Sequence, residues 1–229
     1  MLYSRTPLHS PFSIREKLLS LDFTLLFSIL LLGVISIFAQ FSSSGGNFDY
    51  FSKSHTIRFG IFFILFLTVA FTQIRFWHSA SFLIFLILLL LLLYVKFYGI
   101  QSQGSRRWVN LFVINLQPSE LMKIGIILFL SNYYHKTSEG DVNKVKYLLY
   151  PVIAILAPFI LVVSQPDLGT AILILLSGVV VTWLAGVRWK IFAYLSLAAI
   201  VLAPIAISFL KPYQKSRILT FLNPDSDPL

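Results

Sequence analysis

Two short segments of similar sequence carry acidic residues in a pattern that suits binding or catalysis: Gln117-Pro118-Ser119-Glu120 and Gln165-Pro166-Asp167-Leu168. Proline is favoured at the first position of a helix, where no amide donor is needed, so each segment predicts a helix that starts at its proline. Glu120 and Asp167 would then lie in the first turn, near the positive end of the helix dipole. Each carboxylate either caps the free amides of its own helix or belongs to a functional site.

Glu120 has a possible partner, because Lys123 follows three residues later on the same face of one helix. An apolar stretch continues from Lys123 to Leu130. Ionisable groups at membrane depth are costly unless they are paired or line a wet cavity, so we interpret Glu120 and Lys123 as a functional buried pair. The alternative is that Lys123 extends to the membrane interface, since it lies only about one turn into the helix.

Basic residues gather at two further places, and both are candidates for contact with an anionic substrate. Arg106 and Arg107 precede Trp108, after a segment of flexible residues at 101–105. Guanidinium groups match phosphate oxygens geometrically, and Trp108 would pack on a sugar ring or lie in the membrane interface. The second group consists of Lys211, Lys215 and Arg217. Lipid phosphates or an acidic partner protein are the alternative ligands for both groups.

Metal and cofactor chemistry has little support in the sequence. Asp225-Ser226-Asp227 resembles a metal-binding motif of sugar-nucleotide transferases, but the neighbouring Asn-Pro and Asp-Pro pairs favour turns. The chain has no cysteine, its four histidines are far apart, and no phosphate-binding loop motif occurs. We therefore predict no metal site and identify no cofactor, while a role for a divalent cation stays open.

Membrane helices must position these residues. Of the 229 residues, 57% are hydrophobic and 12% are charged, and the mean hydropathy is +0.83, whereas soluble domains carry about a quarter charged residues. The net charge of +9 is spread over short loops, which indicates contact with lipid headgroups rather than with nucleic acid. The predicted fold class is all-α, a polytopic transmembrane helix bundle.

Apolar runs in the sequence predict seven membrane helices, since each run approaches the length that crosses about 30 Å of hydrocarbon. The first is expected to be a retained signal anchor, because it is long and lacks a small-residue cleavage site. Pro158 and Pro204 are expected to kink the fifth and the seventh helix. The runs cover residues 21–40, 57–73, 79–99, 117–134, 147–163, 169–186 and 191–210.

Loop charges place the N-terminus in the cytoplasm, because cytoplasmic loops carry an excess of lysine and arginine. The loop at 135–146 contains three lysines, at positions 136, 144 and 146, whereas the loop at 164–168 contains no basic residue. With this orientation, Arg106, Arg107 and the basic group at 211–217 face the outside. An anionic ligand there would explain basic residues on the unexpected side of the membrane.

Three regions are expected along the chain. Residues 1–20 form a cytoplasmic N-terminal segment, residues 21–210 form the bundle of seven helices, and residues 211–229 begin a large extracytoplasmic loop that is truncated.

Four motifs, in this order and at this spacing, resemble the family of shape, elongation, division and sporulation (SEDS) proteins, which includes RodA, FtsW and SpoVE. The motifs are Gly104–Trp108, Gln117–Lys123, Gln165–Thr170 and Tyr213–Leu229. Leu168 after Asp167 and the ending Asp225–Leu229 are more similar to the RodA branch than to FtsW. Family members have ten helices, so the resemblance implies that this sequence holds the N-terminal seven-helix portion and stops inside the large outer loop.

The resemblance implies a peptidoglycan glycosyltransferase that polymerises lipid II during cell elongation and shape maintenance, in the bacterial inner (plasma) membrane. A class B penicillin-binding protein would be its partner. Glu120 and Lys123 match a buried pair thought essential in the family, and the proposed catalytic carboxylate is expected beyond Leu229, which leaves open whether this chain alone is an enzyme. The substrate-binding candidates are Arg106, Arg107, Trp108, Gln117, Asp167, Lys211, Lys215 and Arg217.

Two other functions compete with the polymerase. The first is a lipid II flippase, which needs a polar path through the bilayer; the polar positions of this sequence lie mainly near the outer helix ends, with apolar runs below them. The second is an inactive fragment that only binds partner proteins.

Overall fold

The computed structural model describes residues 18–19, 21–48, 50–102, 105–110, 115–208 and 215. Lys211, Arg217 and the Asp225–Asp227 motif therefore lie outside the described residues. The chain divides into an N-terminal unit, Met1–Gln73, and a C-terminal unit, Ile74–Leu229. Each unit is described by itself.

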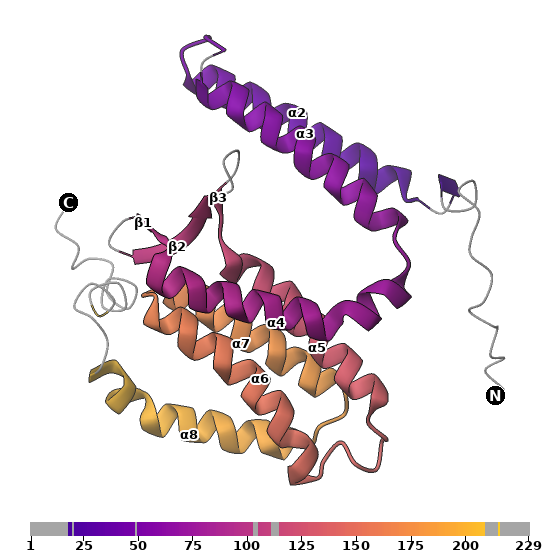
Figure 1. Cartoon of the computed structure of the whole chain (residues 1–229), viewed down its shortest axis with the longest axis vertical. Coiled ribbons are helices and arrows are strands. Elements are labelled where there is room, and N and C mark those ends of the chain that lie inside the picture. The colour runs from indigo at the N-terminus through magenta and orange to yellow at the C-terminus, as the bar shows by residue number, and fades with distance from the viewer. Residues whose placement is uncertain are drawn as a thin grey trace. The chain divides into compact units, whose positions relative to one another are not determined.

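The N-terminal unit contains a pair of packed helices, α2 (Phe23–Ser43) and α3 (Tyr50–Phe71) (Figure 1). Asp22 begins α2 as a cap, because its carboxylate accepts hydrogen bonds from the amides of residues 24 and 25 at 2.9 and 3.1 Å. Gly33 lets the two helices approach closely, because a Cβ atom at this position would overlap the ring of Phe59. Small residues of this kind are typical of contacts between membrane helices.

The C-terminal unit consists of five helices, within the part of the chain that is described, and a short sheet. The helices are α4 (Ile74–Tyr98), α5 (Pro118–Lys136), α6 (Val145–Ser164), α7 (Leu168–Leu184) and α8 (Trp189–Ser208). Helix α5 packs on α4 and α7, and α6 packs on α7 (Figure 1). The fully buried side chains between them are mainly apolar and include Leu92, Met122, Ile126, Val162 and Ile174; Ser81 of α4 is a polar exception. The core of this unit therefore lies among α4, α5, α6 and α7.

The short sheet lies between α4 and α5 in the chain and was not predicted. Its strands are β1 (Ile100–Ser102), β2 (Ser105–Asn110) and β3 (Asn115–Leu116), all antiparallel, with β2 in the middle. Gln101 faces Arg106 and Ile100 faces Trp108, so Arg107 is an extra residue in β2. Such a β-bulge changes the direction of a side chain and is frequent next to functional sites.

Hydrogen bonds between distant parts of the chain define two ends of the C-terminal unit. At the sheet end, which comprises β1–β3 and residues 165–167, Gln165 donates to the carbonyl oxygen of Leu92 at 2.8 Å. At the loop end, which comprises residues 137–144 and 185–188, the backbone amide of Arg188 donates to the side-chain oxygen of Asn143 at 2.8 Å. The helices of this unit thus run alternately up and down.

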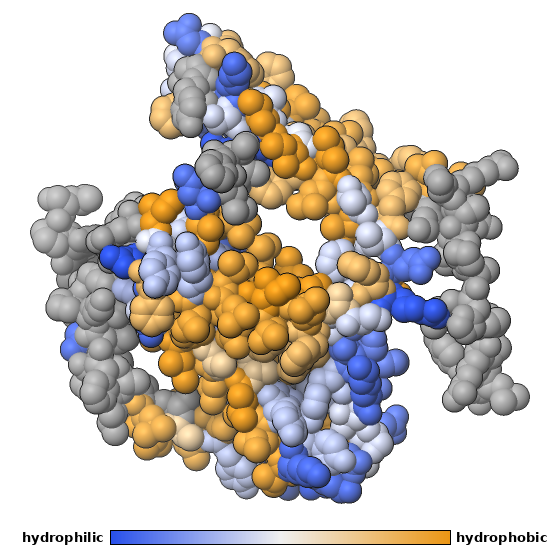
Figure 2. Space-filling view, viewed as in Figure 1, coloured by the Kyte–Doolittle hydropathy of each residue, from blue (hydrophilic) through white to orange (hydrophobic). Residues whose placement is uncertain are grey.

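All seven predicted helices are present among the described residues, each within a few positions of its expected bounds except α3 and α4, which begin earlier, at Tyr50 and Ile74. Helices α2, α4, α6 and the Phe51–Phe71 part of α3 are long and apolar enough to cross a membrane. Figure 2 shows a mainly hydrophobic surface over α4 and hydrophilic residues at the passage from α5 to α6. The predicted class, a polytopic bundle of membrane helices, is confirmed, with the short sheet as an addition.

Candidate functional site

Asp167 is the centre of a polar cluster at the sheet end of the C-terminal unit. Its carboxylate accepts a hydrogen bond from Nε2 of Gln117 at 3.0 Å and lies 3.7 Å from Nη1 of Arg107. The other oxygen accepts from the backbone amide of Thr170 at 3.4 Å and so caps α7. Only 12% of the Asp167 side chain is exposed. An enclosed polar group needs hydrogen-bond partners, and the cluster provides them.

Arg107 reaches this cluster from the bulge in β2. Its Nη2 donates to the carbonyl oxygen of Pro166 at 3.0 Å, so the guanidinium group is bonded to two consecutive residues ahead of α7. Its Nε is buried and has no hydrogen-bond partner within the described part of the chain. Arg107 therefore holds the junction of α6 and α7 in place, and one buried donor is still unused.

Gln117 connects the starts of α5 and α7. It occupies the N-cap position of α5, yet its side chain does not cap that helix. Its amide nitrogen instead donates to Oγ of Ser119 and to Asp167, at 3.1 and 3.0 Å. The predicted helix start at Pro118 is confirmed.

The helix start predicted at Pro166 is wrong by two residues. Helix α7 begins at Leu168 and Asp167 is its N-cap, so Pro166 precedes the helix. The reason is that the Asp167 side chain binds the free amide of Thr170, so Asp167 is the N-cap and the helix starts at Leu168. The interpretation of Asp167 as a helix cap is confirmed, and its carboxylate also contacts Gln117 and Arg107.

Glu120 and Lys123 form the predicted ion pair, with 2.8 Å between Nζ and Oε2. The pair is not buried by the described residues, because 52% of the Glu120 side chain and 25% of the Lys123 side chain are exposed. The reason is the rotation of α5 about its axis: Pro118, Ser119 and Met122 occupy the buried face, and Glu120 lies off that face.

Arg106 and Arg107, both predicted as substrate-binding candidates, contact different parts of the fold. Nη1 of Arg106 donates to the carbonyl oxygen of Phe97 at the end of α4, at 2.6 Å, and the residue is exposed. Trp108 is half-buried on β2. The bulge at Arg107 explains why adjacent arginines contact different elements. Of the second basic group, only Lys215 is described, as a single half-buried residue.

Gln165 is a structural residue that was not among the residues predicted from the sequence. Its side chain is 4% exposed and ties the end of α6 to α4 through the bond to Leu92. The repeated Gln-Pro pair at 117 and 165 was the signal that could have identified it, since both glutamines bond across helices. In the described residues no group of three or more His, Asp or Glu side chains is arranged to hold a metal ion.

The chain is similar to proteins named peptidoglycan glycosyltransferases. It is 34% identical over 179 residues to the probable peptidoglycan glycosyltransferase FtsW of Buchnera aphidicola subsp. Baizongia pistaciae, covering 78% of this chain and 47% of that protein. It is 32% identical over 213 residues to the peptidoglycan glycosyltransferase MrdB of Escherichia coli K12, covering 91% and 56%. The chain thus spans about half the length of the curated relatives it matches.

Two solved structures share the fold. One comes from work on the structural coordination of polymerization and crosslinking by a peptidoglycan synthase complex; it has a TM-score of 0.77 and 27% identity, over 92% of this chain and 62% of that chain. The other is Rod shape determining protein RodA of Thermus thermophilus, with a TM-score of 0.68 and 24% identity, over 82% and 60%. The FtsW/RodA/SpoVE family, described as cell cycle protein, matches residues 18–229. The chain therefore belongs to the FtsW/RodA/SpoVE family, the SEDS family that its motifs resemble.

Proposed function

We propose that the chain is part of a peptidoglycan glycosyltransferase that polymerises lipid II, and that the sheet end of the C-terminal unit contributes to its substrate-binding surface. The observation that carries this proposal is the convergence of Arg107, Gln117 and Asp167. Arg107 contacts Pro166, 59 positions away in the chain, and Gln117 contacts Asp167, 50 positions away. The names of the relatives, peptidoglycan glycosyltransferases, support the same activity.

The proposed reaction defines what the protein must supply. An acceptor sugar hydroxyl forms a bond to the anomeric carbon of the donor, and the bond from that carbon to undecaprenyl pyrophosphate breaks. A base must take the hydroxyl proton, and positive charge must stabilise the leaving pyrophosphate. We place the base in the outer loop beyond Leu229, as the family resemblance implies.

Arg106 and Arg107 have different roles in this proposal. Arg106 is exposed, and only its Nη1 forms a hydrogen bond that the structure shows, so its other donors are open to a phosphate group. Arg107 is a positioning residue, because it is bonded to Asp167 and to the Pro166 carbonyl. Trp108, Glu120 and Lys123 would border the same surface, and Lys211, Lys215 and Arg217 would add positive charge to it.

We further propose that the protein lies in the bacterial inner membrane with its N-terminus in the cytoplasm. It would have a RodA-like role in elongation and shape maintenance, with a class B penicillin-binding protein as its partner. The three lysines of the loop at 135–146 support the orientation. Leu168 after Asp167 and the ending Asp225–Leu229 support the RodA-like role. The solved peptidoglycan synthase complex, which couples polymerization to crosslinking, supports the partner.

The apolar core favours a polymerase over a flippase. A flippase needs polar groups along a path through the bilayer, whereas the fully buried side chains between the two ends of the C-terminal unit include Leu92, Met122 and Ile126.

The first test is to read the nucleotide sequence beyond the codon for Leu229. A reading frame that continues into an acid-bearing outer loop and three more helices is the expected result. The protein encoded by the whole frame is then reconstituted in vesicles with its penicillin-binding protein partner and supplied with external lipid II. Glycan polymer is expected. Transbilayer movement of labelled lipid II without polymer would favour the flippase and overturn the proposal.

Substitutions then test the site. Arg106→Gln is expected to slow polymerisation about tenfold or more, since a lost contact to developing charge has effects of this order or larger. Arg107→Gln is expected to slow it about as much, because it releases the Pro166–Asp167 junction and so misplaces the substrate surface. Arg188→Gln is the matched control, because Arg188 is exposed at the loop end and should leave the rate unchanged. Full activity in both sheet-end variants would contradict this assignment of the site.

A further inference from the structure

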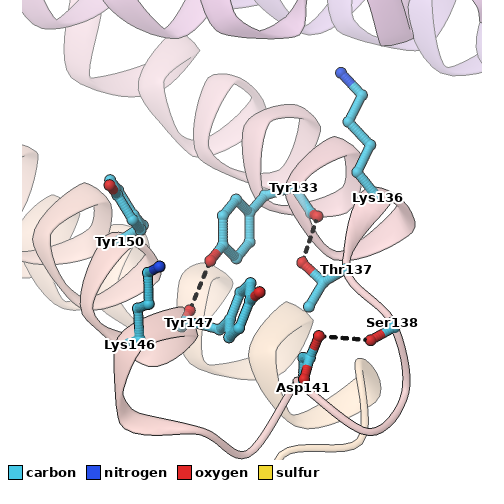
Figure 3. A pocket seen from close by; sticks show the side chains of 8 residues that line it. All are labelled: Tyr133, Lys136, Thr137, Ser138, Asp141, Lys146, Tyr147 and Tyr150. Atoms are coloured by element: carbon cyan, nitrogen blue, oxygen red, sulfur yellow. Dashed lines mark hydrogen bonds between the residues drawn. The ribbon is translucent and has the colours of Figure 1, made fainter.

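An open pocket of ≈ 460 Å³ lies at the loop end of the C-terminal unit, where α5 ends and α6 begins. Three tyrosines line it, Tyr133 from α5 and Tyr147 and Tyr150 from α6, together with Lys136 and Lys146 (Figure 3). This pocket is at the opposite end of the unit from Arg107 and Asp167, so the proposed polymerase site does not account for it.

Hydrogen bonds hold the walls of the pocket together. The Tyr133 hydroxyl donates to the carbonyl oxygen of Tyr147 at 2.8 Å and so joins α5 to α6. The Thr137 hydroxyl donates to the carbonyl oxygen of Tyr133 at 2.9 Å, and the rings of Tyr133 and Tyr150 lie 6.2 Å apart. The pocket is therefore a formed feature of the fold rather than a gap between independent helices.

The charge in the pocket is positive. Asp141 is its acidic lining residue, and this carboxylate accepts a hydrogen bond from Ser138 at 2.8 Å and pairs with Lys144, which does not line the pocket. Lys136 and Lys146 form no ion pair with any residue that the structure describes. Figure 3 shows the side chain of Lys146 directed toward the tyrosine side of the pocket, whereas Lys136 extends away from the other lining residues.

The depth of the pocket in the membrane limits what can enter it. Helix α6, Val145–Ser164, is apolar enough to span a membrane, and Lys146 lies in its first turn. The pocket is thus at the boundary between hydrocarbon and headgroups, where tyrosine and lysine side chains are favoured. The abundant anion at this depth is the phosphate diester of a phospholipid, and basic pockets between membrane helices on the cytoplasmic side bind such headgroups.

We propose that this pocket binds the phosphate of an anionic glycerophospholipid, with Lys146 as the main charged contact and the Tyr150 hydroxyl as a hydrogen-bond donor. The acyl chains would lie along the exposed apolar side chains of α6, such as Leu149 and Ile153.

The test measures equilibrium binding of fluorescent phosphatidylglycerol to the purified protein in detergent. Lys146→Gln is expected to weaken binding about fivefold, since one basic residue near a lipid phosphate contributes about that factor. Tyr150→Phe is expected to weaken it about threefold by removing one neutral hydrogen bond. Both side chains are exposed, so neither substitution should disturb folding.

Lys190→Gln is the matched control, because Lys190 is exposed at the start of α8 and does not line the pocket. It should bind the probe as the parent protein does. Three results would overturn the proposal: equal loss in Lys190→Gln and Lys146→Gln, equal binding of fluorescent phosphatidylcholine, or full displacement of the probe by an equal concentration of inorganic phosphate. The last result would assign the pocket to a soluble phosphate instead of a lipid.

Discussion

Asp167 has two separable functions at the residue scale, and two substitutions distinguish them. Asp167→Asn keeps a side-chain oxygen that can cap α7 but removes the charge opposite Arg107. Asp167→Ala removes both and is expected to unfold more easily than Asp167→Asn by about 1 kcal/mol, the usual contribution of an N-cap. Thermal unfolding of both variants in detergent measures the difference. Equal stability of the two variants would show that capping contributes nothing.

The contact between Arg107 and Asp167 is tested by a double-substitution cycle. Arg107→Gln and Asp167→Asn together should destabilise the protein by less than the sum of the two single changes, because each alone leaves the other charge without its partner. Residues in direct contact show coupling of about 0.5–3 kcal/mol, measured from the same unfolding experiments. Additive changes in the free energy of unfolding would mean that Arg107 and Asp167, 3.7 Å apart, do not interact.

Asp141 and Lys144 predict a pH dependence at the loop end. The Lys144 ammonium group, and after it the Ser138 hydroxyl, lower the pKa of Asp141, while Asp141 raises the pKa of Lys144. Stabilisation by the pair is therefore complete between the two ordinary pKa values. It is lost in acid as the pH falls through the lowered pKa of Asp141, and in alkali as the pH rises through the raised pKa of Lys144.

Hydrogen exchange of the loop at 138–144 measures this dependence. Protection should be highest near neutral pH, and Asp141→Asn should remove the dependence at both extremes. Glu139→Gln, in the same loop but without an ion pair in the described residues, is the control and should retain it. A flat profile in the parent protein would contradict the pKa shifts.

At the scale of elements, glycines set how closely the helices pack. A Cβ atom at Gly178 would lie 2.5 Å from Cγ1 of Ile155, so α6 and α7 touch through this position. Gly178→Ala is expected to destabilise the protein by about 1–3 kcal/mol, because the added methyl group forces the two helices apart. Gly169→Ala is the control in the same helix, since no atom lies within 4 Å of its Cβ position. Thermal unfolding that ranks the two variants in the opposite order would refute this packing.

The short sheet is the element that aims the two arginines. The extra residue in β2 lets Arg107 contact Pro166 and Asp167 while Arg106 contacts Phe97. If these residues formed a helix, the side chains of Arg106 and Arg107 would point about 100° apart around the same helix axis. The sheet instead connects the end of α4 with the α6–α7 junction.

At the scale of the whole molecule, the orientation in the membrane is the most direct prediction. The natural chain has no cysteine, so single cysteines report on accessibility without background. Arg106→Cys at the sheet end should react with a membrane-impermeant thiol reagent on intact cells, whereas Glu139→Cys at the loop end should react only after lysis. The reverse labelling would place the sheet end in the cytoplasm and remove the basis for the proposed substrate surface.

The positions of the helices were largely predictable from the sequence, because hydropathy is a property of each segment alone. A run of apolar residues long enough to cross the bilayer forms a helix wherever its neighbours lie, since the backbone must satisfy its own hydrogen bonds in lipid. The residues Gln117 and Asp167 were likewise identified as candidates from their own helix starts.

Contacts between segments were decided only by the tertiary structure. Three features depend on how each helix is rotated about its axis and on which helix packs beside it. They are the contacts of Arg107 with Pro166 and Asp167, the exposure of Glu120, and the pocket of tyrosines at the loop end. The bulge in β2 likewise follows from pairing with β1 rather than from the local sequence. Rotation and pairing arise from the interlocking of side chains across the core, which no single segment of the sequence encodes.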